Sequence, residues 1–233
     1  MSEYIYGSDY SGDSLRWLTK NDDVSDTIGL QKLQNEIIKN NDAAFAFFFA
    51  TDFEYKTYLM QKVILDKKDA KYAYVFAQNI KNADIKALQN IVAESNKIKY
   101  ITHFACFVKQ ADRKLLESLI VKSKSVKYTH MYLKHVKSAD VNKFKDVILE
   151  SGKPRYLFEL AKHLTSQEEV EQIEDLIIQS KSFTYMRLFA EKIKGANIEK
   201  IERAVLASDN GAEIKKFAKY VKKSKMKHFL LMV

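Results

Sequence analysis

The sequence predicts an all-α protein, a right-handed α-solenoid of stacked two-helix repeats. A unit of about 28 residues recurs along the chain, and the apolar residues inside each unit return at helical spacing. The 233 residues include only six glycines and one proline, too few for a fold with many tight hairpin turns. A 46% share of apolar residues is normal for a globular protein and argues against a disordered chain.

The repeat is clearest in a column of tyrosines spaced 28, 28, 28 and 29 residues apart. This column holds Tyr72, Tyr100, Tyr128, Tyr156 and Tyr185. Four residues later stand Phe76, Phe104, Tyr132, Leu160 and Phe189, and eight residues later Ile80, Val108, Val136, Leu164 and Ile193. Two further apolar columns hold Leu88, Leu116, Phe144, Ile173 and Ile201, then Val92, Ile120, Ile148, Ile177 and Val205. Agreement in so many columns indicates a true internal repeat.

Each unit is predicted to fold as two short helices. Apolar residues at offsets 0, 4, 5 and 8 from the tyrosine form one stripe of the first helix. An Asp or Asn then offers an N-cap oxygen for the second helix, at Asp84, Asp112, Asp140 and Asn197. A serine followed by Asn, Lys, Gly or Asp closes each unit, at Ser95, Ser123, Ser151, Ser180 and Ser208.

We expect residues 13–233 to form a single α-solenoid domain of about seven hairpin repeats and a partial C-terminal unit, with residues 1–12 as an N-terminal leader or cap. A two-helix unit cannot bury its apolar stripe alone, so neighbouring units must stack. In this general architecture the chain resembles the HEAT, armadillo and tetratricopeptide proteins, and helical repeats of uncharacterised bacterial and viral proteins. Those three families have units of about 34 to 47 residues, so the resemblance implies the fold and carries over no binding residue.

The cysteine content and the length of the apolar runs indicate the cellular compartment of the protein. Cys106 is the single cysteine, which excludes an internal disulfide and a cysteine-based zinc site and fits a reducing compartment. The longest purely apolar run, residues 43–50, is too short to span a bilayer. No signal-peptide pattern opens the chain. We therefore expect a cytoplasmic protein with no membrane contact.

The net charge of +9 is concentrated in a central stretch and in a lysine-rich tail. Basic residues precede the tyrosine column, forming a first ladder of Lys71, Lys99, Lys127 and Arg155. A second ladder follows the first helix of the units, with Lys81, Lys109, Lys137 and Lys194. The ladders fit three readings: solvated structural edges, a nucleic-acid surface that tracks phosphates, or contacts to an acidic protein partner. Lysine near a helix C-terminus also complements the helix dipole, which accounts for the second ladder without a ligand.

Signals for chemistry are weak. The chain has no glycine-rich phosphate loop, HExxH motif or nucleophile elbow. His135 and His163 occupy the same offset and could bind a metal with Glu159, but two polar positions on an outer helix face is the simpler reading. We expect Cys106 to be a buried apolar thiol. His103 and His130 are expected at the surface or in the seams. The acidic cluster at Glu168, Glu169, Glu171, Glu174 and Asp175 is read as a solvated helix face or a contact for a basic partner.

These observations favour a non-catalytic interaction module, with no cofactor, no metal and no enzymatic activity expected. A small solenoid acts by occupying a surface, as a protein-binding adaptor or inhibitor, and a phage or viral origin is one reading of such a module. A protein is the expected partner. The alternative is sequence-tolerant nucleic-acid binding through the ladders. The candidate binding residues are Lys71, Lys81, Lys99, Lys109, Lys127, Lys137 and Arg155.

Overall fold

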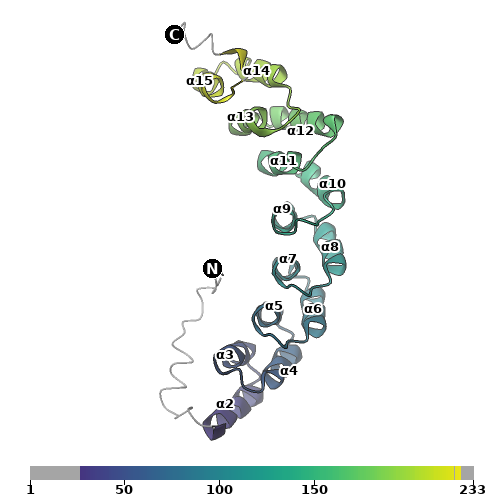
Figure 1. The fold of residues 1–233 in the computed structure, drawn as a ribbon, viewed down its shortest axis with the longest axis vertical. Helices are drawn as coiled ribbons and strands as arrows, with labels where there is room; N and C mark the ends of the chain where they lie inside the picture. The colour runs from purple at the N-terminus through teal and green to yellow at the C-terminus, as the bar shows by residue number, and fades with distance from the viewer. Residues whose placement is uncertain (1–26, 223, 227–233) are drawn as a thin grey trace. The chain divides into compact units, whose positions relative to one another are not determined.

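The computed structural model describes residues 27–222 and 224–226, and in these ranges the chain forms fourteen α-helices and no strand (Figure 1). The predicted all-α class is therefore confirmed for the described residues. The helices are α2 (Thr27–Asn40), α3 (Ala43–Phe53), α4 (Thr57–Lys67), α5 (Ala70–Asn79), α6 (Ile85–Glu94), α7 (Ile98–Phe107), α8 (Arg113–Lys122), α9 (Val126–His135), α10 (Asn142–Ser151), α11 (Pro154–Ala161), α12 (Gln167–Gln179), α13 (Phe183–Lys192), α14 (Ile198–Leu206) and α15 (Gly211–Tyr220). The predicted leader or cap, residues 1–12, lies outside the described residues.

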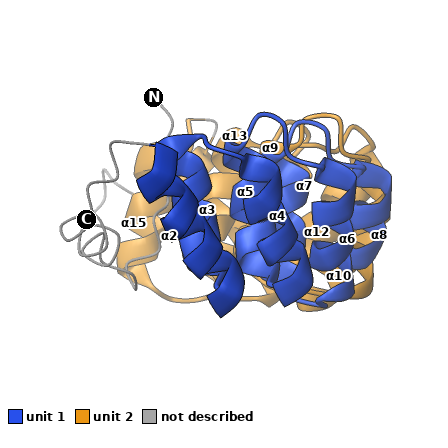
Figure 2. Ribbon diagram, turned by 90° about the horizontal axis from the view of Figure 1, so that it is seen from below, with its two compact units in different colours: residues 1–119 blue, residues 120–233 orange. Residues whose placement is uncertain are grey.

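Contacts between helices divide the chain into two compact units, residues 1–119 and residues 120–233 (Figure 2). In unit 1, α3 packs on α4 and α5 on α6, so consecutive helices form hairpins. The odd-numbered helices α3, α5 and α7 lie side by side in one layer, and α2, α4 and α6 lie side by side in a second (Figure 1).

Unit 2 has the same internal order. The hairpins are α9–α10, α11–α12 and α13–α14, and the odd-numbered helices α9, α11, α13 and α15 each pack on the next. The even-numbered helices α10, α12 and α14 lie on the other side of this layer (Figure 1). Each helix therefore buries its apolar stripe against its hairpin partner and its neighbours in the chain.

The core consists of the apolar columns that the sequence predicts. The column four residues after each tyrosine is at most 1% exposed, and so are the two columns of the second helices. Full burial of one such side chain contributes about 1.5–3 kcal/mol relative to exposure. The tyrosines themselves are half-buried. The aromatic side chains of these columns are therefore buried or half-buried in both units.

The connection inside each hairpin differs from the prediction in one detail. The residue eight positions after the tyrosine was expected in the helical stripe, but Ile80, Val108 and Val136 have extended backbone just past the last helical turn. Val108 and Val136 remain buried because the chain turns back over the core at this point. The second helix then begins at the expected cap: Asp84 Oδ1 accepts from the Ala87 amide at 3.0 Å and Asn197 Oδ1 from the Lys200 amide at 3.1 Å.

The connection between hairpins uses the serine column and one left-handed residue. The Ser95 hydroxyl donates to the Val92 carbonyl oxygen at 2.7 Å and accepts from the Lys97 amide at 3.1 Å. The same pair of bonds is made by Ser123, Ser151, Ser180 and Ser208. Positive φ angles of 50° to 58° recur 27 to 29 residues apart, at Asn41, Lys68, Asn96, Lys124, Gly152, Lys181 and Asp209.

The unit at residues 154–182 is irregular and accommodates its additional residue in the second helix. Helix α11 has 8 residues and α12 has 13, whereas the neighbouring helices α9, α10 and α13 have 10 each. Glu168 and Glu169 lie in the first turn of α12, where carboxylates complement the helix dipole. The acidic cluster thus favours an early start of this helix.

A column of buried and half-buried polar residues, which the sequence analysis does not predict, links the second helices. The side-chain oxygens of Gln61, Gln89, Glu174 and Glu202 each accept from a backbone amide 23 residues later, at 2.7 to 2.8 Å. Each bond joins an even-numbered helix to the start of the next helical segment in the same layer. At the position of this column in α10, Lys145 instead pairs with Glu169 at 2.6 Å. In the sequence, this column is visible as a polar residue that recurs next to the apolar columns of the second helices.

The left-handed connectors predict opposite effects for two substitutions. Gly152 has φ +58°, and a Cβ placed there has no neighbour within 4 Å, so Gly152→Ala adds only backbone strain. We expect it to lower the free energy of unfolding by about 1 kcal/mol. Lys181→Gly, at φ 54°, should raise it by up to about 1 kcal/mol. Urea titrations followed by circular dichroism measure both, with Lys181→Ala as the control that keeps the strain. A Gly152→Ala variant more stable than the wild type would contradict a left-handed backbone at Gly152.

The buried column predicts a pH-dependent effect at Glu174. Burial raises the pKa of the Glu174 carboxyl above its ordinary value, against the opposing effects of the Asn197 amide and Lys200. The folded state therefore disfavours the charged form, and this destabilisation is lost as pH falls through the raised pKa. Glu174→Gln keeps the acceptor oxygen without the charge.

We therefore expect a higher melting temperature for Glu174→Gln at pH 7, and a difference from the wild type that shrinks as the pH falls from the raised pKa toward 4.5, the ordinary glutamate pKa. The matched control is Gln89→Glu in the same column, which should lower the melting temperature at pH 7 and recover in acid. Melting curves at several pH values measure these differences. A Glu174→Gln variant less stable than the wild type at pH 7 would show that the Glu174 charge stabilises the fold, which contradicts the prediction.

Candidate functional site

The first ladder lies at the second residue of four odd-numbered helices, α5, α7, α9 and α11. Each cation lies over the ring of the tyrosine that follows it: Lys71 Nζ is 5.1 Å from the Tyr72 centroid, and Lys99 Nζ is 5.5 Å from that of Tyr100. Lys127 and Arg155 repeat the contact at 5.3 and 5.9 Å. A cation at a helix N-terminus is unfavourable for the helix dipole, and the tyrosine ring offsets part of this penalty.

The tyrosine rings also pack against the preceding odd-numbered helix. Tyr156 on α11 is 5.2 Å from the His130 ring on α9, and Tyr185 on α13 is 6.1 Å from Phe158 on α11. In unit 1, Tyr72 is 6.4 Å from Phe47. A half-buried ring with a cation over it presents little free face for a stacked base. The tyrosine rings therefore serve mainly to pack adjacent odd-numbered helices together.

The second ladder lies at the opposite end of the same helices. Lys81, Lys109 and Lys137 are exposed and stand two residues after the last residues of α5, α7 and α9. The two ladders therefore lie at opposite ends of ten-residue helices, each about 15 Å long. The structure therefore does not bring the two ladders together into one site.

The histidines fall into two groups. His103 and His130 lie between helices, which is one of the two placements that the sequence predicts. The His103 ring is 5.5 Å from the Tyr74 ring. Burial lowers the pKa of His130, so this side chain is neutral at pH 7. His135 and His163 are exposed. No group of three or more His, Cys, Asp or Glu side chains in the described part of the chain is placed to hold a metal ion.

The acidic cluster of α12 makes ion pairs within unit 2. Glu169 pairs with Lys145 of α10 at 2.6 Å, and Asp175 pairs with Lys200 of α14 at 2.6 Å. Glu174 Oε1 is 3.5 Å from the same Lys200 ammonium. These pairs connect three even-numbered helices, so part of the cluster holds the layer together, while Glu168 and Glu171 are exposed.

Unit 2 separates charge between its two layers. Helices α9, α11, α13 and α15 carry eight basic and three acidic side chains, a surplus of five positive charges. Helices α10, α12 and α14 carry four basic and nine acidic side chains, a surplus of five negative charges. This separation follows only from knowing that alternate helices share a layer, so the net charge along the sequence does not reveal it.

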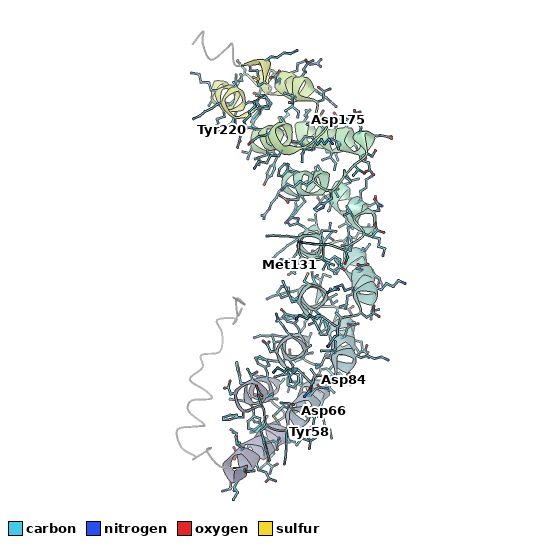
Figure 3. The ribbon with its side chains drawn as sticks, viewed as in Figure 1. Tyr58, Asp66, Asp84, Met131, Asp175 and Tyr220 are labelled. Carbon is cyan, nitrogen blue, oxygen red and sulfur yellow. The ribbon has the colours of Figure 1, made fainter. Side chains whose placement is uncertain are left out.

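The outward side of α9, α11, α13 and α15 is here named the odd face of unit 2. Its exposed or half-buried apolar side chains include Met131, Leu188 and Tyr220, none of which the sequence reading singled out. Figure 3 shows Met131 and Tyr220 on this side of unit 2 and Asp175 on the side of the even-numbered helices. Met131 and Leu188 both stand three residues after a tyrosine of the column, and this shared position is the sequence signal for them.

Comparison of the chain with protein-family models, curated proteins and solved structures finds no match. Among the described residues, no helix is both long enough and apolar enough to cross a membrane.

The single thiol provides a test of the packing around α7. Cys106 is half-buried, less than the full burial that the sequence predicts. Its partial burial raises the pKa of the thiol to about 12, although Arg113 opposes the shift. Compared with the ordinary value of 9.0, the thiolate fraction at pH 8 falls about a thousandfold. We expect the native chain to react with a disulfide reagent far more slowly than the chain unfolded in urea. Native labelling at the rate of the unfolded chain would contradict this burial.

Proposed function

We propose that the chain is a right-handed α-solenoid that acts in the cytoplasm as a non-catalytic, protein-binding module, an adaptor or inhibitor. The packing of each odd-numbered helix on its hairpin partner and on the next odd-numbered helix supports serial stacking within each unit. This is the arrangement on which the likeness to HEAT, armadillo and tetratricopeptide proteins depends. Residues 13–233 would then form one continuous array of repeats.

One observation carries the proposal: the odd-numbered helices share a constant buried frame and present a variable half-buried position. Three residues after the tyrosine column stand Val75 and His103 in unit 1, and Met131, Glu159 and Leu188 in unit 2. The next residue in every helix is apolar or aromatic and at most 1% exposed. A shared framework with differing surface residues is the pattern of a recognition surface.

The protonation state of the single cysteine, Cys106, supports a role without catalysis. Its raised pKa keeps the Cys106 thiol protonated at neutral pH, and a thiol rather than a thiolate is a poor nucleophile.

Nucleic-acid binding is the second candidate, favoured by the position of the first ladder. Lys99, Lys127 and Arg155 lie in the first turns of α7, α9 and α11, whose N-cap residues make no side-chain hydrogen bond to the helix amides. Open amides and a nearby cation attract phosphates. The covered tyrosine rings weigh against base stacking, so such binding would rest on charge and fall steeply with salt.

Affinity purification of the tagged chain from its native host, with nuclease treatment at physiological salt, tests the proposal. We expect a protein partner in stoichiometric amount. Met131→Asp/Leu188→Asp should release that partner, whereas Tyr58→Asp on the even-numbered side of unit 1 (Figure 3) should retain it. Recovery of nucleic acid without a stoichiometric protein, together with salt-sensitive oligonucleotide binding, would overturn the proposal in favour of the second candidate.

A further inference from the structure

The positive charge on the odd face of unit 2 is not neutralised within that layer. Its three carboxylates are each paired locally: Glu159 with Lys162 at 2.7 Å, Glu191 with Arg187 at 3.4 Å, and Glu213 with Lys216 at 2.7 Å. No ion pair among the described residues engages the other cations of these helices, Lys127, Lys134, Arg155, Lys192, Lys215 and Lys219. The face therefore presents surplus cations to solvent.

Apolar and aromatic groups lie among these cations. Tyr220 is 47% exposed, and its ring has two cations over it, Arg187 at 5.0 Å and Lys219 at 5.3 Å. Met131 on α9 and Leu188 on α13 are half-buried. The exposed Tyr220 and the half-buried Arg187 and Met131 belong to residue types that are enriched in the cores of protein–protein interfaces.

We infer that the odd face of unit 2 binds an acidic amphipathic segment of a protein partner, an inference that rests on the proposed function. The carboxylates of such a segment would meet the unpaired lysines, and its apolar side chains would cover Met131 and Leu188. Charge complementarity of this kind sets specificity and the rate of association.

A polynucleotide fits this face less well. Phosphates would gain from the lysines, but Met131 and Leu188 would remain uncovered, and the carboxylates of Glu159 and Glu191 lie on the same helices. The cations already over the Tyr220 ring compete with a stacked base. The mixture of charge and apolar surface therefore favours a polypeptide.

The test measures binding of three fluorescent probes to the full chain by anisotropy. The probes are a peptide of glutamate, leucine and phenylalanine, the same peptide with lysine in place of glutamate, and a single-stranded oligonucleotide. Lys134→Glu/Lys192→Glu reverses two exposed cations of the odd face, and Lys86→Glu/Lys114→Glu is the matched reversal on α6 and α8. Circular dichroism and melting curves establish that both variants fold.

We expect the acidic peptide to bind and the lysine peptide not to bind. Lys134→Glu/Lys192→Glu should weaken acidic-peptide binding by about tenfold or more, and the matched reversal by less than about twofold. Equal weakening in both variants, preference for the oligonucleotide, or binding of no probe would overturn the inference. Self-association lost in Lys134→Glu/Lys192→Glu would also overturn it, because the occupant would then be a second copy.

The two proposals fail in different ways. A native partner that binds Lys134→Glu/Lys192→Glu as tightly as the wild type would refute the acidic segment and leave the interaction module in place. Binding of the acidic peptide by a chain with no native protein partner would refute the proposed function and leave the chemistry of the face in place.

Discussion

The structure depends on the inability of a short amphipathic helix to bury its apolar stripe alone. Ten residues give fewer than three turns, which is marginal for an isolated helix in water. Each stripe is therefore covered by the hairpin partner and by the next helix of the same layer, through columns such as Phe76, Phe104 and Phe189. Because every contact is made with a neighbour in the chain, the outward faces remain free to vary. The buried columns therefore determine the stability of the fold, and the outward-facing positions determine the properties of its surface.

The sequence predicts the part of the fold that repeats in apolar residues. The columns of Phe104, Leu116 and Ile120, the caps at Asp84 and Asp112 and the serine closures lie where the periodicity indicates. The expected cap at Asp140 is wrong by one residue, because the N-cap of α10 is Val141. The periodicity does not show that Val108 leaves the helix and stays buried, since a turn back over the core depends on tertiary packing. Nor does it locate the early start of α12, where carboxylates in the first turn outweigh the register of the neighbouring units.

The candidate site was less predictable than the fold. The ladder residues are correctly placed along the helices, but the sequence does not show that Lys99 lies over the Tyr100 ring or that Lys109 is at the other end of α7. The charge of the odd face of unit 2 depends on which helices share a layer. Summed along the chain, the acidic residues of α12 conceal it, because they belong to the opposite side of the hairpin.

The hydrogen bonds that span 23 residues have a consequence for how such a chain can change its length. In unit 1, Gln61 accepts from the Asp84 amide and Gln89 from the Asp112 amide in the same geometry. Excision of residues 70–97 would therefore present the Asp112 amide to Gln61 with the donor and the acceptor matched. Loss of this hairpin from unit 1 would leave the Gln61 oxygen with a backbone donor, whereas a deletion of any other length would misalign the donor and the acceptor.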